Sequence, residues 1–359
     1  MNKLAFIICT ESNVISMTRY IEQNNYNYSN IDIFICNHTT KMYDYYKKIK
    51  ELDIFNSVLF IKDMEIQNFK GIYRIKKILS RVLLTYKFMT SEKIKEDYNQ
   101  VGIFNLNPFT VIFIERIMEK RHCEFIQLEE GLSTYFLEEK NFSFDKYKFI
   151  CRFIKRNIFS LNNISKIYIS NPNLYSGDSR TSLLRLNPLN NHGREIINLI
   201  FNYRKTDIFD ENKYIFLDQP FLKEGFMFNY KEICDIITEI TRNNVLFKLH
   251  PRTDLKEFNS ANKKIYTNNE YPFSLICCNE NINCNIFISV SSTAALDSIF
   301  QNTDNKNKII FLYKIINDKK LNSVINPKFF KKLEEQYGEQ IIIPNTLNEL
   351  KEIIRNSER

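Results

Sequence analysis

The stretch that most constrains the fold is an abrupt change from a strand pattern to a helix pattern. Residues 286–290 form a β-rich run that is apolar except for Ser289, and three hydroxyl residues follow it directly: Ser291, Ser292 and Thr293. Small helix-forming residues come next, at 294–297. This order predicts a strand, a tight turn and a helix, with the hydroxyl groups at the start of the helix.

Two upstream stretches repeat this pattern. Residues 213–217 and 244–249 are predicted strands, and Asp218 and His250 follow them. Carboxyl ends of parallel strands share one edge of a sheet, which is where α/β proteins bind ligands. We therefore expect both side chains to meet the hydroxyl residues at one edge of a parallel sheet.

The hydroxyl residues allow two interpretations. Backbone N–H groups at the start of a helix lack partners and favour an anion such as a phosphate. Ser and Thr also cap helices, which is the commoner role for an isolated hydroxyl residue. The polar ends of the two neighbouring strands favour the anion site.

The composition is sufficient for the hydrophobic cores of two globular domains, and the net charge favours an anionic partner. The chain has 359 residues, 44% of them hydrophobic, which is enough for two ordinary domains. A net charge of +8 favours a nucleotide, a nucleic acid or an anionic membrane. Because no aromatic-basic RNA motif or basic helix-turn-helix pattern occurs, we expect no nucleic acid partner.

Targeting and redox signals point to a reducing cytoplasm. The opening strand at residues 4–9 is too short for a signal peptide, and no apolar run reaches the length of a transmembrane helix. The 8 Cys are scattered without a CxxC pair or a Cys/His cluster. They are typical of buried thiols, and they predict neither disulfides nor a zinc site.

The first half of the chain alternates strands with helices. Strands are predicted at residues 4–9, 31–36 and 57–61, with helices at 13–23 and 43–52 between them. This alternation indicates a parallel sheet with crossover helices.

A basic amphipathic segment at residues 68–90 comes next. Such a helix usually covers a sheet with its polar face in solvent, and the alternative is a membrane-surface helix.

A later strand, predicted at residues 123–128, runs into Glu129, Glu130 and Gly131. Two adjacent carboxylates at a strand end are either a polar turn or an acid or base directed into a cleft. The residues alone leave both interpretations open.

The chain loses clear periodicity after residue 171 and then restarts the same alternation. We therefore expect an N-terminal domain at residues 1–170, an interdomain connection at 171–210 and a C-terminal domain at 211–359.

His250 is the most informative single side chain. Pro251 after it restricts the turn, and Arg252 adds a cation. An imidazole, with an unperturbed pKa of about 6.5, can donate to a phosphate or protonate it as it leaves. Neither a Gly-rich phosphate loop nor a cluster with metal-ligand spacing occurs, so we expect no metal.

Three short motifs occur in the order found in bacterial sialyltransferases: Glu129-Glu130-Gly131, His250-Pro251 and Ser291-Ser292-Thr293. The overall length and the opening strand before a helix resemble glycosyltransferase family 52, which includes lipooligosaccharide α-2,3-sialyltransferases. Polysialyltransferases share the three motifs, and family 52 also has glucosyltransferase-type members.

The resemblance implies an α/β fold of the GT-B type, with two Rossmann-like domains facing across a cleft. The N-terminal domain would bind the acceptor and the C-terminal domain the nucleotide. The donor would be CMP-sialic acid, and its anomeric centre would be inverted. The acceptor would be a terminal galactose of a surface glycan, such as a lipooligosaccharide.

The resemblance also assigns roles to residues. His250 and Pro251 match the motif that meets the CMP phosphate, and three hydroxyl residues match the group that holds it: Ser291, Ser292 and Thr293. The base that takes the acceptor proton is either Asp218 or Glu130, with a slight preference for Asp218.

Two other functions remain open at this point. A GT-B glycosyltransferase could use another nucleotide sugar, or the chain could bind a nucleotide or a glycan without catalysis. We expect no cofactor beyond the donor substrate. Peripheral association with the cytoplasmic face of an anionic membrane and homodimerisation stay open as well.

Overall fold

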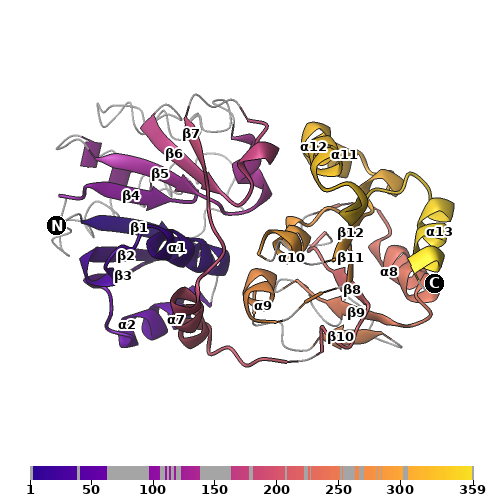
Figure 1. Ribbon diagram of the computed structural model, residues 1–359, viewed down its shortest axis with the longest axis horizontal. Helices are drawn as coiled ribbons and strands as arrows, with labels where there is room; N and C mark the ends of the chain where they lie inside the picture. Colours follow the sequence, from indigo (N-terminus) through magenta and orange to yellow (C-terminus); the bar gives the residue numbers. More distant parts are fainter. Residues whose placement is uncertain are drawn as a thin grey trace, which may run out of the picture. The chain divides into compact units, whose positions relative to one another are not determined.

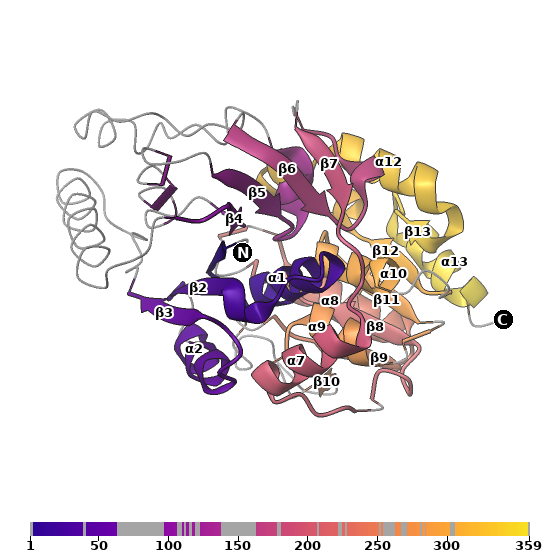
Figure 2. The same ribbon diagram turned by 60° about the vertical axis from the view of Figure 1, so that its left-hand side comes forward.

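In the computed structural model the chain divides into two compact units, residues 1–202 and 203–359. The described residues are 3–38, 41–62, 97–105, 110, 113–114, 117–118, 123–137, 163–177, 181–206, 208–221, 225–226, 228–250, 253, 263–266, 271–280, 282–283, 285–301 and 306–357. The basic amphipathic segment at 68–90 lies outside them. Figure 1 and Figure 2 show the elements of each unit.

Unit 1 is built on a seven-stranded sheet in the order β3-β2-β1-β4-β5-β6-β7, with every pair parallel. Its strands are β1 (Leu4–Ile8), β2 (Ile31–Cys36), β3 (Ser57–Ile61), β4 (Gln100–Ile103), β5 (Glu124–Leu128), β6 (Ile164–Ile169) and β7 (Ser182–Arg185). Its helices are α1 (Glu11–Gln23), α2 (Met42–Glu51) and α7 (Asn191–Phe201), with 3₁₀ turns η1 (Tyr28–Asn30), η2 (Leu132–Phe136) and η5 (Pro172–Leu174).

Unit 2 has a six-stranded parallel sheet in the order β10-β9-β8-β11-β12-β13. Its strands are β8 (Tyr214–Leu217), β9 (Val245–Lys248), β10 (Lys264–Tyr266), β11 (Ile286–Ser289), β12 (Lys308–Phe311) and β13 (Ile341–Ile342). Its helices are α8 (Tyr230–Ile240), α9 (Phe273–Asn279), α10 (Asp297–Phe300), α11 (Lys319–Val324), α12 (Pro327–Tyr337) and α13 (Leu347–Ser357). The 3₁₀ turns are η6 (Thr293–Leu296), η7 (Tyr313–Ile315) and η8 (Gly338–Gln340).

The central strands are apolar because both faces of each sheet are covered. All residues of β1, β8 and β11 are buried, as expected for parallel strands inside an α/β layer. On β4, Gly102 lies opposite Phe6 of β1, and a Cβ at this position would come within 2.4 Å of the Phe6 ring. Glycine therefore lets the aromatic ring pack directly on the neighbouring strand.

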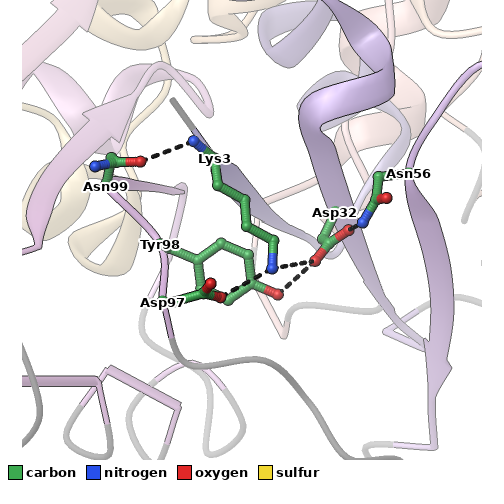
Figure 3. Close-up of polar contacts among 6 residues, drawn as sticks. All are labelled: Lys3, Asp32, Asn56, Asp97, Tyr98 and Asn99. Atoms are coloured by element: carbon green, nitrogen blue, oxygen red, sulfur yellow. Dashed lines mark hydrogen bonds and ion pairs between the residues drawn. The ribbon is translucent and has the colours of Figure 1, made fainter. Parts of the chain in front are cut away.

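The amino edge of the unit 1 sheet is held by a buried carboxylate (Figure 3). Asp32 of β2 accepts hydrogen bonds from the Tyr98 hydroxyl at 2.7 Å and from Asn56 Nδ2 at 2.5 Å. Lys3 Nζ lies 3.9 Å from the same carboxylate and 2.9 Å from Asp97. These contacts tie the beginnings of β1, β2 and β4 together at the edge opposite the strand ends that carry the sequence motifs.

The segment expected to connect the domains contains elements of unit 1 instead. Strand β7 extends its sheet, and α7 packs against α1 and α2. Asn190 caps α7 and donates to Glu22 of α1 at 2.7 Å, while the Phe201 ring lies 4.9 Å from that of Tyr45. Most of this segment therefore belongs to unit 1, and the division of the chain falls between Asn202 and Tyr203.

Candidate active site

Unit 2 brings the three predicted strand ends together. Strand β8 lies between β9 and β11, so Asp218, His250 and Ser291 all follow neighbouring parallel strands. The backbone N–H of Asp218 donates to Lys248 O at 3.0 Å, which continues the β8–β9 pairing past the strand end. The structure thus places Asp218, His250 and Ser291 at the same edge of the sheet, as expected, whereas Pro251 and Arg252 lie outside the described residues.

The Asp218 carboxylate is fully engaged. The Tyr230 hydroxyl donates to Oδ1, and Oδ2 accepts from the His250 backbone N–H at 2.9 Å and from the Thr253 hydroxyl at 2.5 Å. Burial raises the pKa of Asp218, and the hydrogen bonds from Thr253, Tyr230 and His250 act in the opposite direction. These bonds hold the loop after β9, and with it His250, in place.

The turn after β11 is fixed by a side chain that the motifs did not indicate. Gln219 Oε1 accepts from the Ser291 backbone N–H at 2.8 Å, and Gln219 Nε2 donates to Ser291 Oγ at 3.4 Å. Because Ser291 Oγ acts as the acceptor here, its own O–H remains available as a donor. The only signal for Gln219 in the sequence is its place directly after Asp218.

The helix after β11 begins as a 3₁₀ turn, and the hydroxyl residues at its start make different contacts. Ser292 Oγ accepts from the Ala294 backbone N–H at 3.3 Å, so the capping interpretation holds for Ser292. The Ser292 N–H donates to Ser289 Oγ at 2.9 Å. Within the described residues the Thr293 hydroxyl has no hydrogen-bond partner. An anion at this turn would therefore meet hydroxyl donors more than free backbone N–H groups.

Unit 1 presents a second carboxylate at the carboxyl end of β5. Glu130 Oε1 accepts from Asn105 Nδ2 at 2.8 Å, and the Glu130 N–H donates to Thr134 Oγ1 at 3.0 Å. Burial raises the pKa of Glu130, and Asn105, His38 and Asn13 oppose this shift. The result is a partly buried carboxylate with a higher affinity for a proton than an exposed glutamate.

Glu129 has a different environment from its neighbour. Its Oε2 accepts from the Ser170 N–H at 2.6 Å and from the Ser170 hydroxyl at 2.5 Å, and its Oε1 accepts from the Tyr135 hydroxyl at 3.0 Å. Arg19 Nη2 in turn donates to Ser170 Oγ at 3.1 Å. Glu129 thus joins β5, η2 and the end of β6, and the two adjacent acids have separate roles.

Gly131 completes this motif through its backbone. Its φ of 142° lies in a region that side chains with a Cβ rarely adopt, and nothing lies within 4 Å of a Cβ placed there. Backbone conformation and not space therefore explains glycine at the position where the chain turns from β5 into η2.

Two kinds of feature are absent from the described part of the chain. No group of three or more His, Cys, Asp or Glu side chains is arranged to hold a metal ion there. Likewise, no described helix combines the length and the apolar character needed to cross a membrane.

Comparisons with known proteins identify the family. The model of the family described as alpha-2,8-polysialyltransferase matches residues 2–300, and no curated protein matches significantly. The structure of the alpha/beta-galactoside alpha-2,3-sialyltransferase from Photobacterium phosphoreum matches with a TM-score of 0.52 and 12% identity, over 98% of this chain and 100% of that one. The MnaA–UDP structure from S. aureus matches with a TM-score of 0.52 and 11% identity, over 99% and 87%.

These matches confirm an α/β fold of the GT-B class with two Rossmann-like sheets. They do not support the resemblance to glycosyltransferase family 52, since the matching family is that of the polysialyltransferases. The three short motifs occur in both families, so they could not separate the two.

The different roles of the two adjacent glutamates predict opposite effects on stability. Glu129→Gln would leave one acceptor oxygen for Ser170 and Tyr135 and remove the charge that strengthens these hydrogen bonds, so it should destabilise the protein by about 1–3 kcal/mol. For Glu130, a folded-state pKa above the unfolded value means that its contribution to stability is lost as pH rises through the folded pKa. Glu130→Gln should therefore melt at or above the wild-type temperature at pH 7.5.

Thermal melting of both variants between pH 4 and pH 8 measures this. Any increase in the melting temperature of Glu130→Gln over the wild type should disappear below about pH 4.3, where the glutamate of the unfolded chain is also protonated. A loss of stability in Glu130→Gln as large as that in Glu129→Gln at pH 7.5 would contradict the account.

Proposed function

We propose that this chain, which belongs to the alpha-2,8-polysialyltransferase family, transfers sialic acid to the end of an α-2,8-linked sialic acid chain. Family membership makes the protein a sialyltransferase that uses CMP-sialic acid. A galactose acceptor and a role in lipooligosaccharide synthesis, which the family 52 resemblance implied, are not supported. A sialic acid chain takes the place of galactose as the proposed acceptor.

The observation that carries the mechanism is the environment of Glu130. Its carboxylate is partly buried, its pKa is raised, and Oε2 has no donor within hydrogen-bond distance among the described residues. A base needs both an available lone pair and a sufficient proton affinity. Glu130 has both, so it is the proposed base.

Burial raises the pKa of Asp218 as well, but its carboxylate has no available lone pair comparable to that of Glu130. Both of its oxygens accept hydrogen bonds from Tyr230, Thr253 and the His250 backbone. We therefore assign Asp218 a positioning role, in which it fixes the loop that carries His250. This reverses the slight preference for Asp218 as the base that the family 52 resemblance gave.

The phosphate of CMP would bind at the carboxyl edge of the unit 2 sheet. The His250 side chain and the hydroxyls of Ser291, Ser292 and Thr293 lie at the ends of β9 and β11. Gln219 supports this role, because it orients Ser291 as a donor. Hydroxyl and imidazole donors stabilise the charge that gathers on the phosphate as it leaves.

The proposed reaction is a displacement at the anomeric carbon of the donor sugar. The acceptor hydroxyl oxygen forms a bond to the anomeric carbon of the donor sugar, with inversion, and its proton passes to Glu130. The bond from that carbon to the CMP phosphate oxygen breaks, and the phosphate keeps the electron pair. His250 donates a hydrogen bond or a proton to that oxygen. No step in this scheme uses a metal ion.

Substitution should separate the base from the donor site. Glu130→Gln should lower kcat by about a hundredfold or more, with the Kd of CMP within about twofold of wild type. His250→Ala should lower kcat similarly and also weaken CMP binding. Glu195→Gln, at an exposed position on α7, is the matched control and should change neither value.

Steady-state kinetics and calorimetric titration with CMP give both quantities. Turnover of Glu130→Gln close to wild type would exclude Glu130 as the base. Unchanged kcat and CMP affinity in His250→Ala would remove His250 from the donor site.

The acceptor is tested by comparing transfer to two classes of oligosaccharide. With CMP-sialic acid as donor, the protein should lengthen α-2,8-linked sialic acid oligomers and leave galactose-terminated oligosaccharides unchanged. Chromatography of the labelled products resolves the added units. Transfer to galactose alone, or CMP release with no transfer to either acceptor, would contradict the proposed function.

A further inference from the structure

Asn13, on the first turn of α1, is a buried amide whose orientation is fixed. Its side chain has no exposed surface, and its Oδ1 accepts from the Cys9 N–H at 2.9 Å and the Thr10 N–H at 3.1 Å. Since two backbone donors hold the oxygen, Nδ2 must point away from them. Among the described residues no acceptor lies within hydrogen-bond distance of Nδ2.

A buried N–H₂ group without a partner is costly, so its surroundings are informative. Asn13 lowers the pKa of the Glu130 carboxyl as a hydrogen-bond donor does. The end of β1 at Cys9 holds Asn13 through its backbone N–H, and its thiol contacts Asn105, which donates to Glu130.

Asn105, after β4, is held in a similar way. Its Nδ2 donates to Glu130 Oε1 at 2.8 Å, and its Oδ1 accepts from the Cys9 thiol at 3.6 Å. Cys9 therefore supports both amides, one through its backbone N–H and the other through its thiol. Strand β1 lies next to β4 in the sheet, and β4 next to β5, so this support crosses three neighbouring strands (Figure 1).

We propose that Asn13 and Asn105 are positioning residues for the Glu130 carboxylate, which they hold ionised and in one orientation for the acceptor hydroxyl. The proposal rests on the proposed role of Glu130 as the base. Two neutral amides stabilise the charged form without an ion pair, so the carboxylate keeps enough proton affinity to act.

Other titratable groups also influence the pH dependence of Glu130. His38, after β2, lowers the pKa of Glu130 through its charge. Glu129, next in the chain, is directed at Ser170 and Tyr135 instead, and the Cys9 thiol contacts Asn105. None of these groups changes in the variants below, so a change in pH profile reports on the two amides.

The decisive variant is Asn13→Asp. An aspartate keeps the oxygen that accepts from Cys9 and Thr10, and it suits a helix start. It replaces the N–H₂ donor that lowers the pKa of Glu130 with a second carboxylate oxygen. Like charges favour the protonated form of Glu130, so the acidic limb of kcat against pH should move up by about one pH unit or more.

Asn105→Ala is the independent variant, because it removes the other donor without adding charge. Loss of a hydrogen bond to the ionised carboxylate should move the acidic limb in the same direction, by about one pH unit. This variant keeps the proposal testable if Asn13→Asp does not fold.

The matched control is Asn190→Asp in the same unit. Asn190 also caps a helix, since its Oδ1 accepts from the Gly193 N–H at 2.8 Å, and its Nδ2 donates to Glu22 Oε2 at 2.7 Å. The same substitution therefore changes the same kind of contact away from Glu130. Its acidic limb should match that of the wild type.

The measurement is kcat from pH 5 to pH 9, with folding checked by thermal melting. Its outcomes distinguish the role of Glu130 as the base from the positioning role of the two asparagines. If Glu130→Gln stays active, the proposed base is wrong and the positioning role fails with it. If Glu130→Gln is inactive but neither Asn variant moves the acidic limb, only the positioning role is overturned. Activity lowered equally at every pH in both folded variants would also overturn it.

Discussion

Parallel strand pairing is the constraint from which the arrangement of both candidate sites follows. It brings every loop that leaves a strand to one edge of the sheet, so residues far apart in the chain become neighbours there. In unit 2, β8 lies between β9 and β11, which places Asp218 beside the loops of His250 and Ser291. In unit 1, the order β1-β4-β5 does the same for Cys9, Asn105 and Glu130.

Polar groups at such an edge are partly buried, so what each carboxylate can do depends on how many donors reach it. Three acids follow strands in the two sites, and they differ in this respect. Glu129 and Asp218 each accept a total of three hydrogen bonds, which are shared between the two carboxylate oxygens. Both residues hold loops in place. Glu130 accepts one hydrogen bond within normal distance and keeps the higher proton affinity that burial gives it. The two adjacent glutamates therefore differ in their hydrogen bonding: Glu129 holds loops in place, and Glu130 is the proposed base.

The strand ends and the alternation of elements could be predicted from the sequence. A short apolar run that stops at polar residues has few structural interpretations other than a buried strand that ends there. The strands ending before Asp218, His250 and Ser291 were all confirmed. The partners of these residues could not be predicted. Thr253 and Tyr230 reach Asp218 only through the packing of a loop and a helix, and no local pattern marks either one.

Other features also depended on tertiary contacts. The connection expected at residues 171–210 differs from the observed division after residue 202, because turn residues have the same composition within a domain and between domains. Helix α7 belongs to unit 1 through its contacts with α1 and α2. The buried Asp32 cluster at the amino edge has no sequence signal, since a single Asp in a strand predicts only weaker pairing (Figure 3). The family could not be chosen from three short shared motifs, and it required a match along residues 2–300.

The proposed mechanism depends most on the raised proton affinity that burial gives the Glu130 carboxylate. The direct measurement is a ¹³C NMR titration of the glutamate carboxyl carbons in the wild type, with the Glu130 resonance identified by its absence from Glu130→Gln. The account predicts an apparent pKa above the ordinary value of about 4.3 for this resonance. A value at or below about 4.3 would show that Glu130 is an ordinary acceptor in a turn, and the assignment of the base would be wrong.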